Sequence, residues 1–430
     1  MKPTFSLAAL SFASFFASAD APTPKNIIYM IGDGMGPAYT TAYRYYQDDP
    51  STAAVEATVF DSMLTGMAHT YPDDDTVVTD SAAAATALAT ATKTYNGAVS
   101  VDAQKQKLKT MLEIAKEKGM TTALVVTSQI NHATPASFTA HNEARYNYDA
   151  IANDYIDNKI NGKLPVDLML GGGTQYFIRE DRNLVNEFIA AGYQYSDSFA
   201  QLEQIEQVPA LGLYAAKGLP FALDSDPLRL SKMAHKALSL LEQNEQPFFM
   251  MIEGSQIDWC GHANDIACTM AEMHDFAEAI KVAKDFIAKN PDTLLVVTAD
   301  HSTGGLTIGA KGQRKWQADV IKGVQATAEV IAERLMTSDN MQEQWQADTG
   351  MAYTKDHEVL LTHAKQVDEE ALVLTVKKLI NEASFTGWTT SDHTGVDVQV
   401  FAHGVGREQF NGSQNNVDIA TKLISFINKQ

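Results

Sequence analysis

The sequence predicts an α/β fold, a three-layer sandwich in which helices flank a large, mostly parallel central sheet. Short apolar runs, bounded by polar or glycine-rich breaks, recur along the chain and are typical of buried strands. The helical patterns that separate these runs often end near Gly, Asn or Pro. Because strands and helices alternate, a parallel sheet covered by helices is expected. The chain has 430 residues, 45% of them hydrophobic and 20% charged, which is enough apolar material for a large packed core.

The predicted elements follow one another in a regular order. Strands are predicted at 26–31, 122–126, 166–170, 248–252, 293–297 and 396–401. Helices are predicted at 108–118, 183–191, 228–243, 266–289 and 417–428. No internal repeat or low-complexity linker interrupts this order, so we expect one large domain.

One stretch, roughly 310–385, departs from this alternation. It contains polar, Gln-rich helical pieces at 325–336 and 370–381, so we interpret it as a peripheral insertion. Such an insertion could form a subunit contact or a lid. An ordinary peripheral pair of helices is equally compatible with the sequence.

The first residues match the three-part pattern of a secretory signal. Met1 and Lys2 precede an apolar stretch at 5–16, and the small residues 17–19 follow it. We therefore predict a signal peptide at 1–19, cleavage after Ala19, and export to the periplasm or the extracellular space. Beyond this segment no run approaches the roughly 18 apolar residues of a membrane span, so we expect a soluble mature protein with no membrane partner.

The charge balance limits the kind of partner that the protein can have. Lys and Arg number 33 against 53 Asp and Glu, and the formal net charge is −20. A surface of this charge repels nucleic acid and anionic membranes at long range. If such a protein handles phosphates, the positive charge must be local, and bound cations with an arginine can supply it.

The chain has only two cysteines, Cys260 and Cys268. They are too few for a disulfide framework and do not form a paired Cys-x-x-Cys zinc pattern. A single bridge is possible in an oxidising compartment, and two buried free thiols are the alternative. The sequence leaves this choice open.

Side chains of metal-binding types stand next to the predicted strands. Asp33 follows the first strand, Glu253 the fourth, and Asp300 with His301 the fifth, whereas His393 comes just before the last strand. Ligands of open α/β sheets gather outside the carboxyl ends of the strands. Imidazole favours zinc, and positions that offer only oxygen favour magnesium.

Asp258 and His262 are four residues apart in the sequence. On a helix this i, i+4 spacing places both side chains on one face, where they can share a metal ion. A carboxylate and a histidine at this spacing are more often a surface pair. The nearby Glu253 and the Asp300–His301 pair favour the metal-binding interpretation.

Ser81 is the candidate nucleophile. A run of alanines follows it at 82–85, which places Ser81 at a helix N-terminus, where unpaired N–H groups and the helix dipole favour anions. The alternative is that Asp80 or Ser81 merely caps this helix, because both are common N-cap residues.

Two nucleotide-binding motifs are excluded. The loop Gly32–Gly36 suggests a dinucleotide site, but the third glycine of G-x-G-x-x-G would fall on Pro37. The chain also contains no G-x-x-x-x-G-K-[ST] loop, so a P-loop nucleoside-triphosphate hydrolase is unsupported.

Taken together, these segments strongly resemble the bacterial alkaline phosphatases, over nearly the whole of residues 20–430. The segments that carry the resemblance are 33–36 (DGMG), 80–82 (DSA), Glu253 with Asp258 and His262, 298–301 (TADH), and 393–395 (HTG). The resemblance implies hydrolysis of phosphate monoesters of broad specificity through a covalent phosphoserine on Ser81. It also implies an alkaline pH optimum and a homodimer.

The same resemblance implies two zinc ions and one magnesium ion. It assigns Asp258, His262 and His393 to the first zinc, and Asp33, Asp300 and His301, joined by deprotonated Ser81, to the second. It assigns Asp33, Glu253 and Thr134 to a magnesium-type third site. Arg145 falls where the family has its phosphate-binding arginine, whose forked donors suit two phosphate oxygens.

Two positions depart from the best-known bacterial members. His132 stands where they have an aspartate near the third site, so it either accompanies a hydrated magnesium or recruits a further zinc. Trp259 stands where they have a lysine that reaches phosphate through water. Because indole carries no charge, we expect weaker phosphate binding and faster product release.

Other functions remain as alternatives. A phosphodiesterase, a phosphoglycerate mutase of the independent type or a sulfatase would belong to the same metalloenzyme superfamily. A sulfatase needs a Cys-x-Pro-x-Arg motif, which follows neither cysteine of this chain. An exported protein that binds metal or phosphate without turnover would leave Ser81 and Arg145 without a task.

Overall fold

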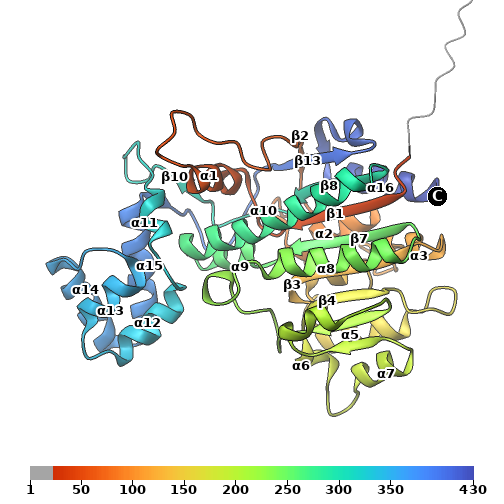
Figure 1. Ribbon diagram of the computed structural model, residues 1–430, viewed down its shortest axis with the longest axis horizontal. Coiled ribbons are helices and arrows are strands. Elements are labelled where there is room, and N and C mark those ends of the chain that lie inside the picture. The colour runs from red at the N-terminus through yellow and green to blue at the C-terminus, as the bar shows by residue number, and fades with distance from the viewer. Residues whose placement is uncertain (1–22) are drawn as a thin grey trace, which may run out of the picture.

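The structure is a computed structural model that describes residues 23–430 (Figure 1). The predicted signal peptide at 1–19 lies outside the described residues. No helix in the described part of the chain combines the length and apolar character that crossing a bilayer requires.

A mixed sheet of 10 strands forms the centre of the molecule, in the order β14-β2-β13-β8-β1-β7-β3-β4-β6-β5. The strands are β1 (Asn26–Gly32), β2 (Leu64–His69), β3 (Thr121–Gln129), β4 (Leu168–Gly172), β5 (Gln194–Ser196), β6 (Ala210–Leu213), β7 (Phe248–Gly254), β8 (Thr293–Ala299), β13 (Val398–Gly404) and β14 (Gly412–Asn415). Strands β8 to β5 pair in parallel, whereas β13 runs antiparallel to both β8 and β2. The predicted α/β sandwich with a large, mostly parallel sheet is therefore confirmed.

Short two-residue strands lie outside this sheet. They are β9 (Ser302–Thr303), β10 (Thr307–Ile308), β11 (Thr386–Gly387) and β12 (His393–Thr394). β12 pairs with β9 and β10 pairs with β11, so the segments around residues 303 and 393 are neighbours although they are far apart in the sequence.

Strand β1 lies between β7 and β8 and is buried along its whole length. Strands covered on both faces carry near-continuous apolar runs, which explains why the segment 26–31 is predicted as a strand from its sequence. The parallel register aligns Gly32 with Gly254 of β7 and with Ala299 of β8. The loops that leave these strands therefore start at the same edge of the sheet.

Helices cover both faces of the sheet. On one face α8 (Arg229–Gln243) packs against α10 (Ile266–Lys289), and α10 packs against α1 (Pro37–Gln47) and α9 (Gln256–His262). On the other, α16 (Asn416–Asn428) packs against α2 (Ser81–Thr90) and α3 (Met111–Glu117), and α2 contacts α4 (Ala133–Ala136). Figure 1 shows α8 and α10 in front of the strands. The elements α5 (Tyr148–Asp157), α6 (Thr174–Phe177), α7 (Leu184–Ala190) and η1 (Phe199–Gln204) precede or connect β4, β5 and β6 along the chain. The short helix η2 (Ala222–Asp224) packs against α10, and η3 (Arg407–Phe410) precedes β14.

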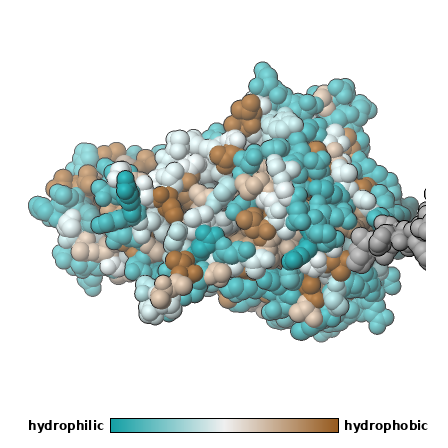
Figure 2. All heavy atoms as spheres, turned by 90° about the horizontal axis from the view of Figure 1, so that it is seen from above, coloured by the Kyte–Doolittle hydropathy of each residue, from teal (hydrophilic) through white to brown (hydrophobic). Residues whose placement is uncertain are grey.

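A group of helices occupies one end of the molecule, at the left of Figure 1. It consists of α11 (Ala318–Lys322), α12 (Ala328–Thr337), α13 (Met341–Thr349), α14 (Lys355–Val367) and α15 (Glu369–Ser384). Helix α15 packs against α11, α12 and α14. The same end carries brown groups in Figure 2, and large apolar side chains on α14 and α15, such as Val359 and Leu374, are exposed.

A buried ion-pair cluster joins α8 to α10 and α9. The Arg229 guanidinium donates to Glu272 at 2.6 Å and to Asp275 at 3.4 Å, and it also donates to Gln256. The side chains of Arg229, Glu272 and Asp275 are 3%, 2% and 1% exposed. Because Gln256 is the first residue of α9, this cluster fixes the start of that helix.

We expect Arg229→Met to lower the free energy of unfolding by about 3–5 kcal/mol, because it leaves two buried carboxylates without a cation. The matched control is Lys232→Met on the same helix, whose partner is Asp226 and whose side chain is 50% exposed; it should cost less than about 1 kcal/mol. Urea unfolding measures both. Equal losses in the two variants would contradict the role given to Arg229.

Candidate active site

Carboxylates and imidazoles converge where β1, β7 and β8 end. Asp33 follows β1, Glu253 is the second-to-last residue of β7, and Asp300 with His301 follows β8. All of them have 0% relative exposure. The aligned ends of parallel strands bring these side chains together at one edge of the sheet.

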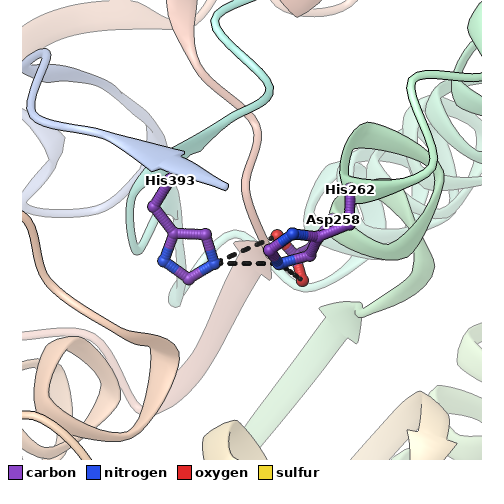
Figure 3. A group of neighbouring side chains, drawn as sticks. All are labelled: Asp258, His262 and His393. Carbon is purple, nitrogen blue, oxygen red and sulfur yellow. Dashed lines mark hydrogen bonds and ion pairs between the residues drawn. The ribbon is translucent and has the colours of Figure 1, made fainter. Parts of the chain in front are cut away.

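The first group consists of Asp258, His262 and His393 (Figure 3). Asp258 and His262 project from α9, one helical turn apart, and His393 comes from β12 on the opposite side. The two histidine Nε2 atoms are 3.0 Å apart. They lie 3.4 Å (His262) and 3.6 Å (His393) from the Asp258 carboxylate.

Backbone carbonyls orient both rings of this group. Nδ1 of His262 lies 2.6 Å from the carbonyl oxygen of Ser391, and Nδ1 of His393 lies 2.8 Å from that of Thr79. Because a carbonyl oxygen only accepts, each Nδ1 carries a proton and donates it, so the atom left to coordinate a cation is Nε2. Two Nε2 atoms directed at one point beside a carboxylate form a set of ligands for a cation.

The second group surrounds His301. Its Nε2 atom lies 3.3 Å from Asp33, 3.3 Å from Asp300 and 3.2 Å from Oγ of Ser81. Oδ1 of Asp300 accepts hydrogen bonds from the backbone N–H groups of Gly34 and His301. Both carboxylate oxygens of Asp33, and Oδ2 of Asp300, are buried without a hydrogen-bond partner.

A third set of oxygens lies beside the second group. Oε2 of Glu253 accepts a hydrogen bond from Ser255 at 2.6 Å, whereas Oε1 has no partner. The hydroxyl of Thr134, close enough to influence the pKa of Glu253, is buried and also unpaired, as is Nδ1 of His132. Buried polar atoms are normally satisfied, so this set of unpaired acceptors fits bound cations.

The pKa values indicate the same need for positive charge. Burial, followed by repulsion from Asp300 and other nearby carboxylates, holds the pKa of Asp33 well above its usual range. Burial raises the pKa of Glu253 to about 8 and that of Asp300 to about 7. Burial and then the charge of Arg145 lower the pKa of His132 to about 3, so this imidazole is neutral. The donor atoms of the first two groups, which include imidazole nitrogens, are of the type that zinc prefers. The oxygens of the third set are of the type that magnesium prefers.

Ser81 is the first residue of α2 and is 1% exposed. Asp80 is the N-cap of this helix, and its side chain accepts a hydrogen bond from the N–H of Ala83 at 2.9 Å. The capping function therefore belongs to Asp80. The Ser81 hydroxyl is directed instead at His301, with the positive end of the helix dipole beside it.

Arg145 lies across the same pocket from these groups. Its Nη1 donates to Oδ2 of Asp80 at 2.9 Å, and its Nη2 lies 3.5 Å from Nε2 of His132. The Arg145 side chain is 11% exposed, and its Nε has no partner. Asp80 thus orients the guanidinium while other donors of the fork remain available.

Trp259 forms part of the pocket wall. Its ring lies 5.7 Å from that of His132 in an edge-on arrangement. A Cβ atom added to Gly218 would lie 2.5 Å from the indole, so the backbone of that loop approaches the ring closely.

The structure brings every residue assigned to the site from the sequence to this one edge of the sheet.

The cysteines next to this site are bonded to each other. The structure joins Cys260 of α9 to Cys268 of α10, and both are buried. The choice that the sequence left open is thus resolved in favour of the bridge. Sequence reasoning did not identify the orienting carbonyls of Ser391 and Thr79, or Thr303, whose hydroxyl donates to Asp258.

Fold and site together define a metal-dependent hydrolase with a serine at a helix N-terminus. The alkaline phosphatase family model matches residues 24–429. Alkaline phosphatase 3 of Bacillus subtilis (strain 168) is 46% identical over 411 residues, which cover 93% of this chain and 88% of that protein. This chain belongs to the alkaline phosphatase family, and it is a phosphoric monoester hydrolase.

Solved structures agree with this assignment. The cold-active alkaline phosphatase from the psychrophile Shewanella sp. has a TM-score of 0.90 and 50% identity, covering 94% of this chain and 99% of that chain. A histidine-to-aspartate variant of the TAB5 alkaline phosphatase, with Mg bound in its M3 site, has a TM-score of 0.70 and 27% identity, covering 95% and 99%. The resemblance expected from the sequence is confirmed.

We expect removal of divalent cations by a chelator to lower the thermal stability of the protein, because the buried carboxylates then repel one another. Zinc plus magnesium should restore it, by about 2.7 kcal/mol per site at a free concentration of 100 times Kd. Differential scanning calorimetry measures both steps. The metal-dependent gain should shrink in Asp258→Ala and persist in Asp397→Ala, whose carboxylate is exposed; a gain of equal size in both variants would show that the cations bind elsewhere.

Proposed function

We propose that the enzyme hydrolyses phosphate monoesters of broad specificity through a covalent phosphoserine on Ser81, with an alkaline pH optimum. The observation that carries the proposal is the position of the Ser81 hydroxyl. It is buried at the start of α2, 3.2 Å from His301, in the pocket that Arg145 also lines. A serine there has both an anion-favouring helix terminus and an arginine opposite it.

The chemistry requires two transfers of the phosphoryl group. Ser81 loses its proton and Oγ forms a bond to phosphorus, while the bond to the ester oxygen breaks and the departing alcohol takes up a proton. Water then attacks phosphorus, releases inorganic phosphate and restores the Ser81 hydroxyl. Arg145 holds nonbridging oxygens during both transfers, and Asp80 keeps the guanidinium in place.

Three cations would complete this site. Asp258, His262 and His393 would hold one zinc, and Asp33, Asp300 and His301 would hold the second. When bound, the zinc ions supply positive charge that lowers the pKa of a coordinated oxygen and stabilises the oxygen of the leaving alcohol.

We assign the third site to magnesium, held by Asp33, Glu253 and Thr134. His132 stands beside it as a neutral imidazole. The TAB5 variant in which a histidine is replaced by aspartate has Mg in its M3 site. In this chain the imidazole of His132 would accompany a hydrated magnesium ion without coordinating it directly.

The rest of the proposal concerns the whole protein. We propose that residues 20–430 form the catalytic domain of an exported homodimer, with residues 310–385 as a peripheral insertion. The Cys260–Cys268 bridge supports export, because disulfides persist in oxidising compartments. Specificity is broad because Arg145 and the metal groups recognise the phosphoryl group that all monoesters share.

Ser81→Ala should abolish the burst of alcohol release and the phosphoenzyme that acid quenching traps. The reason is that alanine has no oxygen with which to bond phosphorus. Rapid-quench kinetics with an aryl phosphate measures the burst. Ser62→Ala, a change at a serine outside the pocket, should keep the burst, and an undiminished burst in Ser81→Ala would remove Ser81 from its role.

Trp259→Lys should strengthen inhibition by inorganic phosphate about three- to tenfold, because it adds a positive charge beside the phosphoryl group. Steady-state inhibition constants measure the effect. Val367→Lys is the control: it adds the same charge at a position that is 59% exposed on α14, outside the pocket lining. Unchanged inhibition in Trp259→Lys would contradict the proposal that the indole weakens phosphate binding.

A further inference from the structure

The pocket around Ser81 is larger than a phosphoryl group requires. Its volume is about 700 Å³, within the range of roughly 300–1,000 Å³ that is typical of sites for whole small molecules. Its lining includes Ser81, Arg145 and the first group of candidate ligands, Asp258, His262 and His393. The rest of the space is available for the organic group of the ester.

Three aromatic side chains also line this pocket. They are Tyr146, Tyr148 and Trp259. Tyr146 is 74% exposed, although a large apolar ring gains by burial. The rings of Tyr146 and Tyr148 pack edge to face, with their centroids 6.3 Å apart and their planes at 82°.

This aromatic row is anchored in the core. The ring of Tyr148 lies 5.0 Å from that of Tyr176, which is only 9% exposed. Nδ2 of Asn131 donates to the carbonyl of Tyr148 at 3.0 Å. The Tyr146 ring is therefore presented to the pocket by a backbone that is held from behind.

Tyr146 is also tied to the residue that binds the phosphoryl group. The Arg145 guanidinium lies 5.7 Å from the centroid of the Tyr146 ring, and the N–H of Arg145 donates to the carbonyl of Gly97 at 2.8 Å. An ester whose phosphoryl oxygens bind Arg145 must direct its organic group outward. That group then passes close to Tyr146.

The remaining wall selects against further anionic groups. Thr76, Val78 and Asn96 line it without a charge, and Asp392 adds a carboxylate. Among the pocket-lining residues in the described range 23–430, Arg145 is the one lysine or arginine. This part of the pocket suits a flat, uncharged ring best, because any such ring can stack on tyrosine.

We propose that Tyr146, supported by Tyr148 and lining the same pocket as Trp259, forms a subsite for the organic group of the substrate. The subsite favours monoesters that carry a flat aromatic ring, either directly on the phosphoryl oxygen or one sugar away, as in a nucleoside 5′-monophosphate. This proposal rests on the function proposed above, and it adds a preference within the broad range of monoesters.

Two pairs of substrates test the subsite. Adenosine 5′-monophosphate and ribose 5-phosphate share a leaving oxygen and differ by the base, whereas phenyl phosphate and cyclohexyl phosphate differ in the flatness of the ring. For each pair, kcat/KM of the substrate with the flat ring is divided by kcat/KM of the substrate without it. This ratio is compared between wild type and Tyr146→Ala, so that differences in leaving-group reactivity cancel. We expect at least one ratio to fall about two- to tenfold, the range that an aromatic pair contributes.

Further variants separate a stacking role from a structural one. Tyr146→Phe keeps the ring and should keep the ratio within about twofold of wild type. Tyr45→Ala removes a tyrosine that is 42% exposed and lines a different pocket, so both ratios should stay unchanged. A fall in the first pair alone indicates a ring at the distance of a base, and a fall in the second alone indicates a ring next to the phosphoryl group; either supports the subsite.

Two outcomes would overturn the proposal. One is that neither ratio changes in Tyr146→Ala. The other is that inhibition by inorganic phosphate weakens by the same factor as the aromatic substrates, which would mean that Tyr146 acts only through Arg145. Both outcomes leave the wild-type burst and its loss in Ser81→Ala intact, so a failure of the subsite is distinguishable from a failure of the phosphoserine mechanism.

Discussion

The whole site depends on repulsion between carboxylates that the fold holds together away from water. Asp33, Glu253, Asp258 and Asp300 are at most 4% exposed and share one edge of the sheet. Arg145 is a single cation, and it is already paired with Asp80. Buried charges are tolerated only when they are paired or coordinate metals. This carboxylate-rich edge must therefore receive positive charge from outside the chain. A protein of net charge −20 then becomes locally suited to an anionic substrate.

The sequence predicted the central strands because burial on both faces gives them unbroken apolar runs. β1, β3 and β7 are buried at every position. β2 and β14 were not predicted, since β2 is mostly half-exposed and contains a glycine, and β14 is the polar segment GSQN. Their strand geometry comes from pairing with β13 and with each other, which a local pattern does not reveal. The predicted helix at 266–289 matches α10 at both ends, and the structure shows that the side chain of Asp265 caps its start.

The candidate site could be predicted as a set of residue types, but its assembly required tertiary structure. The i, i+4 spacing of Asp258 and His262 is local, and so is the position of Ser81 before an alanine run. His393 precedes its strand instead of following it, and it reaches the site because β13 runs antiparallel to β8. The carbonyls that orient the imidazoles carry no sequence signal, because every residue has one. The cysteine pairing likewise needed the crossing of α9 and α10.

The carbonyl of Thr79 links two parts of the site that differ in chemistry. It accepts the Nδ1 proton of His393, and it lies only two residues before Ser81, with Asp80 between them as the helix cap. A short rigid stretch of backbone thus sets both the ring that faces Asp258 and the hydroxyl that faces His301. The two groups are also close in space, because the rings of His301 and His393 stack with centroids 3.6 Å apart. A change in the backbone at Thr79 would therefore displace the His393 imidazole and the Ser81 hydroxyl together.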